Sequence, residues 1–150
     1  MNDSIPPQAI TLIQSFESCR LTAYQDGRGT WTCGWGSTGS DIGPGTVWTQ
    51  DYADHRLIED VTDACDTVRA HVTVTLTDNE LSALTSFVYN VGYGDFVNST
   101  LLKMLNQGFY QQVPVQLMRW NHIGQTVSFG LTRRRTAECR LWNLADPSSA

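Results

Sequence analysis

The sequence carries little charge, and its balance is slightly acidic. Of its 150 residues, 17% are charged, and the formal net charge is −5. Such a chain has no long-range positive field that would attract nucleic acid. The only dense basic run is the three arginines at 133–135, so we expect no nucleic-acid partner.

Long apolar runs are absent as well. No segment approaches the roughly 18 apolar residues that a membrane-spanning helix needs. The first residues, MNDSIPPQAI, lack the basic and apolar regions of a signal peptide. We therefore expect a protein that is made in the cytoplasm and does not insert into a membrane.

The four cysteines form no C-x-x-C pair, which argues against a zinc ribbon. Cys19, Cys33, Cys65 and Cys139 could form two disulfides in any of three pairings, and the sequence does not choose among them. Four free thiols are the alternative.

Helical periodicity covers most of the chain. An apolar stripe at i, i+3, i+4 and i+7 follows two prolines and predicts a helix that ends at Glu17. Further helices are predicted from Thr49, from Thr77 with Glu80 as its capping-box partner, over 98–108 and over 131–144. Residues 110–120 are ambiguous because Pro114 either breaks or starts a helix.

One region has β-strand character. Residues 21–25 (LTAYQ) and 30–36 (TWTCGWG) are rich in β-formers, and the Asp-Gly between them is a strong hairpin signal. The sequence thus predicts an α+β, mainly helical chain with one small β region at about 18–48.

Two carboxylates stand beside this hairpin. Glu17 lies at a predicted helix C-terminus, where the negative pole of the helix dipole disfavours its ionised form. A protonated carboxyl group is what general acid catalysis requires. Asp26 opens the turn, and the preference of turns for Asp-Gly would by itself explain it.

The arginine run lies on the last predicted helix. At about 100° per residue, Ala137, Leu141 and Leu144 form the apolar stripe of that helix. Arg133 and Arg134 flank the stripe, whereas Arg135 is predicted to point to the opposite side. One of the first two could reach a carboxylate, and a solvated helix start is the alternative.

The pattern E-x8-D-x5-T, formed by Glu17, Asp26 and Thr32, resembles the active-site segment of phage-type lysozymes, the endolysins of glycoside hydrolase family 24. The stretches SFVYNVGYGDFVNSTLLKMLNQG and RWNHIGQTVSFGLTRRRTAECRLW are similar to that family's C-terminal lobe. The likeness extends from about residue 9 to residue 144. It implies one two-lobed lysozyme domain over 1–150, with a β-containing lobe at about 18–70. The helical lobe would consist of residues 71–145, approximately, together with the N-terminal helix.

The activity implied is that of a muramidase (EC 3.2.1.17). It would cleave the β-1,4 bond between N-acetylmuramic acid and N-acetylglucosamine in peptidoglycan, and so lyse the host of a phage or prophage. Glu17 would be the general acid, while Asp26 would stabilise the transition state and, with Thr32, position water. Such a pair needs neither metal nor cofactor, and inverting enzymes separate their carboxyl groups by about 6.5–9.5 Å. With closer carboxyl groups, Asp26 would instead be a covalent nucleophile.

The resemblance also implies supporting residues. Arg134 is expected to pair with Glu17, and Arg133 is the second choice. Gly36, Tyr89 and Asn90 match segments that line the family's sugar-binding cleft. Ordinary core packing is the alternative for Tyr89. The protein is expected to be a monomer that acts on periplasmic peptidoglycan after its release from the cytoplasm.

Two departures from the family pattern stand out. Many relatives carry His after GWG, where this chain has Ser37. Many wall hydrolases are also basic, whereas this chain is acidic, and this difference in charge predicts weak activity on intact cells. A disulfide between Cys19 and Cys33, which flank the site, is a further hypothesis.

Two other functions fit the same scaffold. A lytic transglycosylase would leave 1,6-anhydro-muramic ends, and an intact Asp26 argues against it. A catalytically inactive glycan-binding or virion module is the other, and the intact triplet argues against that one.

Overall fold

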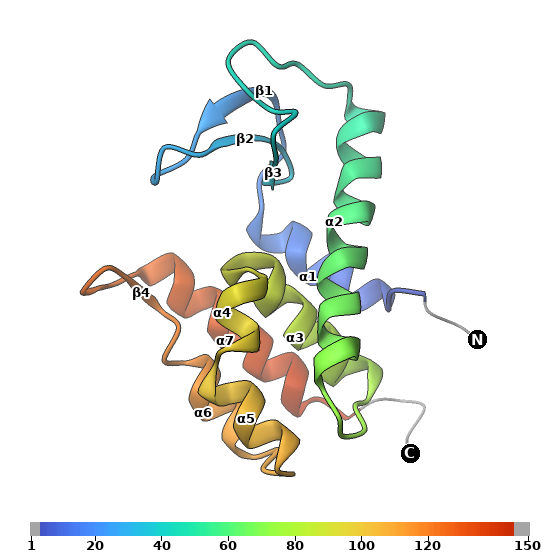
Figure 1. Cartoon of the computed structure of the whole chain (residues 1–150), viewed down its shortest axis with the longest axis vertical. Coiled ribbons are helices and arrows are strands. Elements are labelled where there is room, and N and C mark those ends of the chain that lie inside the picture. The colour runs from blue at the N-terminus through green and yellow to red at the C-terminus, as the bar shows by residue number, and fades with distance from the viewer. Residues whose placement is uncertain (1–3, 146–150) are drawn as a thin grey trace.

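The computed structural model describes residues 4–145 and confirms the predicted α+β, mainly helical fold with two lobes. A small antiparallel sheet lies at one end of the molecule and a group of short helices at the other (Figure 1). The long helix α2 (Gln50–His71) runs alongside both. The other helices are α1 (Pro7–Phe16), α3 (Asp78–Val91), α4 (Tyr93–Val97), α5 (Thr100–Asn106), α6 (Gln112–Leu117) and α7 (Phe129–Asn143).

The small sheet contains three strands in the order β1 (Arg20–Gln25), β2 (Trp31–Gly34) and β3 (Ser37–Thr38). The first two form the predicted hairpin. Thr32 lies on the middle strand, since it pairs with Tyr24 on one side and with Thr38 on the other.

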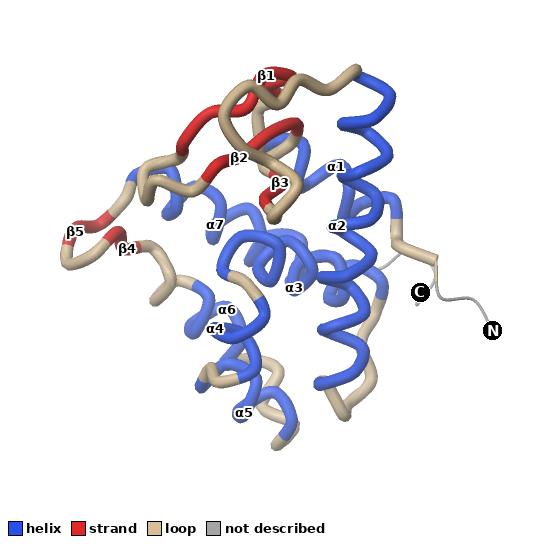
Figure 2. Tube along the Cα trace, turned by 45° about the horizontal axis from the view of Figure 1, so that its top comes forward, coloured by secondary structure: helices blue, strands red, loops and turns tan. Residues whose placement is uncertain are grey.

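A second hairpin joins the last two helices of the helical lobe. Its strands are β4 (His122–Ile123) and β5 (Thr126–Val127), and they pair only with each other. Figure 2 shows this hairpin on the same side of the molecule as the turn between β1 and β2. Neither β3 nor this hairpin is predicted by the sequence.

Helix α3 lies at the centre of the helical lobe. The predicted capping box begins it: Thr77 Oγ1 accepts from the backbone N–H of Glu80 (3.1 Å), and Glu80 Oε1 accepts from that of Thr77 (2.9 Å). All residues from 81 to 88 are buried. Because neighbouring elements cover α3 on all sides, the polar residues Ser82, Thr85 and Ser86 are buried together with its apolar ones.

The apolar core has two parts. The larger part fills the helical lobe around Phe87, Phe96 and Leu105. The smaller part comprises Ala9, Ile13, Leu57 and Val61, from α1 and α2. Tyr89 packs against both parts, so the end of α3 lies where the two lobes meet.

The short helices follow local signals. Gly92, with φ of 95°, separates α3 from α4, because few residues other than glycine adopt that conformation. The ambiguity at Pro114 is resolved as a helix, since Pro114 is the third residue of α6, in the first turn, where no N–H is needed.

The prediction for the buried face of α7 is wrong. Its buried residues are Arg134, Arg135, Glu138 and Trp142, whereas Leu144 is 60% exposed. Arg135, predicted to point away from the buried face, is fully buried. The physical reason is that the facing surface of α3 offers the polar Ser86, so charged side chains find partners there.

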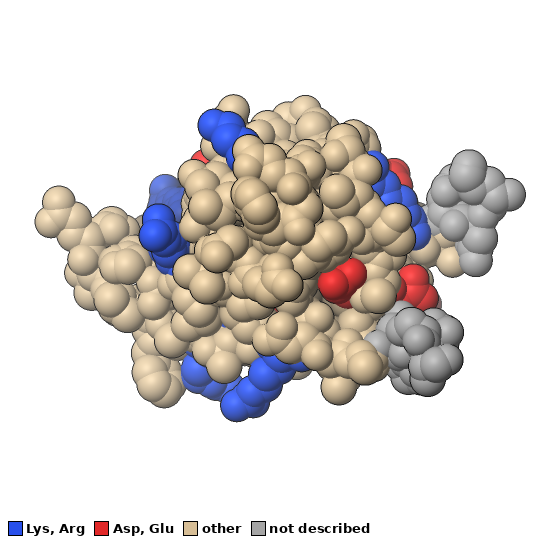
Figure 3. All heavy atoms as spheres, turned by 90° about the horizontal axis from the view of Figure 1, so that it is seen from below, with Lys and Arg blue, Asp and Glu red and all other residues tan. Residues whose placement is uncertain are grey.

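The surface carries few charges. On the face of the helical lobe that Figure 3 shows, Lys and Arg side chains are spread among uncharged atoms rather than gathered into one patch. Within residues 4–145, no helix is both long enough and apolar enough to cross a membrane.

Removal of the α3 cap should destabilise the protein. We expect Thr77→Ala to lower the free energy of unfolding by about 1 kcal/mol, because the N–H of Glu80 loses its acceptor. Urea unfolding would measure the change. Thr73→Ala, in the exposed loop before α3, is the matched control; equal losses in the two variants would contradict the role of the cap.

Candidate active site

A cleft of about 400 Å³ lies between the sheet and the helical lobe. Six of the seven residues expected at the site line it: Glu17, Asp26, Thr32, Gly36, Tyr89 and Asn90. The seventh, Arg134, is not part of its wall but contacts Glu17. The rest of the wall is formed by Tyr24, Arg28, Thr30, Thr38, Val91 and Gly92.

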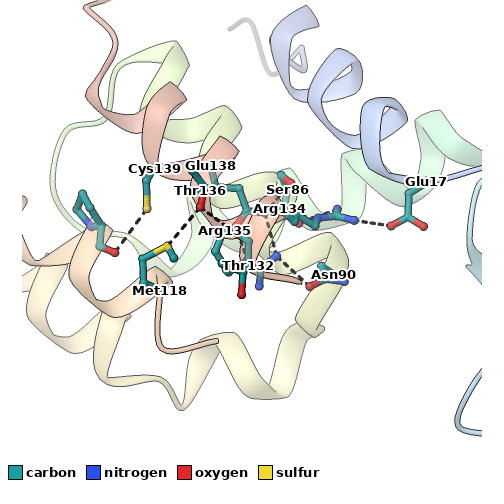
Figure 4. Close-up of polar contacts among 11 residues, drawn as sticks. Glu17, Ser86, Asn90, Met118, Thr132, Arg134, Arg135, Thr136, Glu138 and Cys139 are labelled. Atoms are coloured by element: carbon teal, nitrogen blue, oxygen red, sulfur yellow. Dashed lines mark hydrogen bonds and ion pairs between the residues drawn. The ribbon is translucent and has the colours of Figure 1, made fainter. Parts of the chain in front are cut away.

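Glu17 enters the cleft from the end of α1. Its backbone N–H still donates to Ile13 O (3.0 Å), whereas its own backbone is extended, so the side chain leaves the helix direction. The Glu17 side chain is 23% exposed, and its Oε2 accepts from Arg134 Nη1 at 2.6 Å (Figure 4). One oxygen of Glu17 is thus held by an ion pair.

The other oxygen, Oε1, lies against Gly36. A Cβ atom built at Gly36 would be 2.9 Å from Glu17 Oε1 and 3.9 Å from the Tyr89 hydroxyl oxygen. Gly36 also has φ of 92°. Both the conformation and the close approach therefore require glycine at this position.

Asp26 is fixed by the hairpin turn. Its Oδ1 accepts from the backbone N–H groups of Arg28 (2.8 Å) and Thr30 (2.9 Å). These two bonds favour the ionised form and hold the pKa of Asp26 below its usual value. The same two bonds that close the Asp-Gly turn also hold the Asp26 carboxyl group at the cleft, so a turn residue and a cleft residue are compatible roles for Asp26.

Thr32 is buried at the back of the hairpin. Its hydroxyl group donates to Thr30 O (3.0 Å), so its oxygen lone pairs are left to accept. The neighbouring Tyr24 ring is covered by the guanidinium group of Arg20, 3.8 Å from the ring centroid. Burial raises the pKa of Tyr24, which keeps its phenol protonated.

The helical side of the cleft is formed by the end of α3. The Tyr89 hydroxyl donates to Trp35 O at 2.7 Å, a bond that joins α3 to the loop after β2. Burial, together with the charge of Glu17, raises the pKa of Tyr89. Asn90 Oδ1 accepts from Arg135 Nη2 at 2.9 Å, so both side chains have fixed orientations.

The three arginines have different surroundings. Arg134 is 4% exposed and contacts Glu17. Arg133 is exposed and lines a second cavity of about 390 Å³, whose wall also includes Glu17, Asn90 and Arg134. Arg135 contacts Glu138, with Nε 2.7 Å from Oε1. Sequence reasoning missed Glu138 and Ser86, although the spacing of Glu138 from Arg135 (i+3) and from Arg134 (i+4) was available as a signal.

No metal site is evident in the described part of the chain, since nowhere in it do three or more His, Cys, Asp or Glu side chains gather closely enough to bind an ion. All four cysteines carry free thiols, so the Cys19–Cys33 disulfide hypothesis is wrong for this structure. Cys33 is instead buried, and its Sγ lies 3.5 Å from Leu21 O.

Ser37, the expected departure from the family pattern, is also buried. Its hydroxyl donates to Asp60 Oδ2 at 2.5 Å, which links β3 to α2. Burial raises the pKa of Asp60, and the Ser37 bond opposes that shift.

Comparison with known sequences places these features in context. The Phage lysozyme family profile matches residues 14–138. An endolysin of Bacillus phage PZA is 39% identical over 147 residues, which cover 97% of this chain and 57% of that protein. An endolysin of Acyrthosiphon pisum secondary endosymbiont phage 1 is 37% identical over 145 residues, 94% of this chain and 99% of that one. The chain thus spans little more than half of the first relative and nearly all of the second.

Solved structures show the same architecture. The muramidase domain of SpmX from Asticaccaulis excentricus superposes with a TM-score of 0.85 at 32% identity. The superposition covers 95% of this chain and 99% of that domain.

The close approach of Gly36 to Glu17 generates a stability prediction. We expect Gly36→Ala to lower the free energy of unfolding by more than the roughly 1–2 kcal/mol that a positive φ alone costs. Gly45→Ala separates the two causes, because Gly45 also has a positive φ (85°) but has open space around it. Urea unfolding of both variants would measure the difference. Equal losses would show that contact with Glu17 contributes nothing.

The two backbone bonds to Asp26 generate a pH prediction. The Asp26 carboxyl should titrate below about 3.9, the value for an unperturbed Asp. Because the folded pKa is depressed, its stabilising contribution is present above the unfolded value and is lost as pH falls through the folded one. An NMR titration would follow the carboxyl carbon and the amide protons of Arg28 and Thr30, which should share one midpoint. Titration at the unperturbed value in the folded protein would contradict the prediction.

Proposed function

The chain belongs to the phage lysozyme family, and we propose that it is a peptidoglycan hydrolase. Its substrate is the β-1,4 bond between N-acetylmuramic acid and N-acetylglucosamine, and its role is lysis of the host of a phage or prophage. The observation that carries this proposal is the pair of unlike carboxyl groups, Glu17 and Asp26, in one cleft. The peptidoglycan it acts on lies in the periplasm, reached after release from the cytoplasm.

Glu17 acts as the general acid. Arg134 holds Oε2, which leaves Oε1, beside Gly36 in the cleft wall, to carry the proton to the glycosidic oxygen. The ion pair thus fixes one oxygen of Glu17, and the other oxygen is available to act on the substrate.

Asp26 supplies the negative charge. Two backbone N–H groups keep it ionised, so it stabilises the positive charge that develops on the sugar ring in the transition state. Thr32 Oγ1, whose proton is directed to Thr30 O, accepts a hydrogen bond from the attacking water. Water attack from the face opposite to Glu17 gives an inverting reaction, in which the ionised Asp26 carboxylate accepts the proton that the water loses. The step uses no metal or cofactor.

Two variants test these roles on purified Gram-negative sacculi. We expect Glu17→Gln to lower the rate of muropeptide release by about 10²-fold or more, since the amide cannot donate the proton. Asp26→Asn should also lower it strongly, because the transition state loses its charge partner. Glu59→Gln, on the exposed part of α2, is the charge-matched control and should keep the wild-type rate.

Mass spectrometry of the released muropeptides decides among the alternatives. Hydrated, reducing N-acetylmuramic ends support the hydrolase. Anhydro-muramic ends would instead establish a lytic transglycosylase and remove the role of Asp26. Sacculus binding without release would identify a binding module.

A further inference from the structure

A cluster of polar and charged side chains is buried behind the cleft, although the rest of the helical lobe is largely apolar. Ser86, Arg135 and Glu138 are 0% exposed, and Arg134 is 4% exposed. Buried charges are costly unless they are paired and hydrogen-bonded. Figure 4 shows how the cluster extends from the interior of α7 to Glu17 and Asn90.

One oxygen atom is the junction of the cluster. Glu138 Oε2 accepts from Ser86 Oγ (2.7 Å) and from Arg135 Nη2 (3.0 Å), and it lies 3.6 Å from Arg134 Nε. Glu138 Oε1 lies 2.7 Å from Arg135 Nε. The carboxylate thus fixes both arginines against α3.

Each arginine extends from this junction to one side chain of the cleft. Arg134 reaches Glu17 Oε2 through Nη1 (2.6 Å), and its Nη2 donates to Ser86 O (3.2 Å). Arg135 Nη2 donates to Asn90 Oδ1 (2.9 Å) as well as to Glu138. The two arginines therefore connect one buried carboxylate to both the sheet side and the helical side of the cleft.

We propose that Glu138 is a positioning residue for the cleft, which orients Glu17 through Arg134 and Asn90 through Arg135. Glu138 itself does not line the cleft. Its effect on catalysis is therefore indirect, and it rests on the proposed role of Glu17.

Charge balance gives the proposal a specific signature. The cluster with Glu17 contains two arginines and two glutamates, so it is neutral when all four are ionised. Without the charge of Glu138, Glu17 is the only carboxylate left to balance two buried cations. The two buried cations then attract the Glu17 carboxylate more strongly than in wild type. A general acid works only while protonated, so activity is lost from a lower pH upward.

The other titratable groups near these carboxyl groups do not remove that signature. The groups that face Glu17 are Arg134 from α7, Tyr89 from α3, Tyr24 from β1 and, across the cleft, Asp26 and Arg28. Arg133 lines the neighbouring cavity that Glu17 also borders, and both it and Arg28 stay charged over the pH range of the profile. Burial keeps both tyrosines neutral at physiological pH. The Cys139 thiol, beside Glu138, is also neutral, because burial and that carboxylate raise its pKa to about 11.

The central experiment compares Glu138→Gln with wild type. The amide keeps the shape and one acceptor oxygen but loses the charge. We expect kcat/KM on solubilised glycan strands to fall about tenfold or more. We also expect the basic limb of the pH–rate profile to move to lower pH. Adding Arg135→Gln restores neutrality, so the limb should return toward its wild-type position. KM should rise, because Asn90 loses the donor that Arg135 supplies.

A matched serine pair controls for general loosening of α3. Ser86→Ala removes the third contact to Glu138 and should lower kcat/KM about threefold. Ser82→Ala, one turn earlier and equally buried, removes a bond only to Asp78 O of its own helix and should leave kcat/KM unchanged. Equal effects in the two variants would overturn the proposal.

A readout without activity separates this proposal from the proposed function. In NMR spectra, Glu138→Gln should change the signals of the Glu17 carboxyl carbon and of the Arg134 guanidinium group, whether or not the protein cleaves peptidoglycan. If wild type releases no muropeptides, the proposed function fails, and these signals still decide the positioning role. A folded Glu138→Gln variant with wild-type signals and a wild-type pH profile would overturn it. Should that variant not fold, the comparison of Ser86→Ala with Ser82→Ala carries the same test.

Discussion

A buried charge has to be balanced within its own surroundings, and this constraint shapes the meeting point of α1, α3 and α7. Arg134 and Arg135 cannot reach solvent, so they need anions inside the protein. Glu138 supplies one from the same helix, and Glu17 supplies the other from the end of α1. The position of Glu17 is therefore part of the charge balance of the core. Helix α3 in turn carries Ser86, which donates to Glu138, where a fully apolar interface would carry a larger aliphatic side chain.

The elements that the sequence predicts well are those with local signals. The capping box at Thr77 and the Asp-Gly turn at Asp26 each involve residues within four positions of one another, and both are present. The cleft residues Glu17, Asp26 and Thr32 come together because they lie on a helix end and one hairpin, 15 positions apart at most. Hydrogen bonds inside that short segment place Asp26 and Thr32, whereas Glu17 also depends on its ion pair with the distant Arg134.

The elements that the sequence predicts poorly depend on distant partners. An apolar stripe locates a buried helix face only where the facing surface is apolar. On α7 the facing surface includes Ser86, 52 positions before Glu138, and Glu17, 117 positions before Arg134. Residues so far apart in the sequence produce no periodic pattern that would predict their contact. The two-residue strands β3, β4 and β5 are likewise too short for alternation, and pairing with a neighbour defines them.

The two carboxyl groups of the cleft have opposite environments, and each environment comes from a different structural source. Asp26 is exposed at a turn whose backbone N–H groups favour its charge. Glu17 is largely enclosed between Gly36 and Arg134, at the floor where the Tyr89–Trp35 bond also joins the helical lobe to the sheet. Both joining contacts involve residues beside Glu17, so its orientation depends on how the helical lobe packs against the sheet. The side chain of Glu17 is thus oriented by the core of the helical lobe, whereas that of Asp26 is oriented by its own turn.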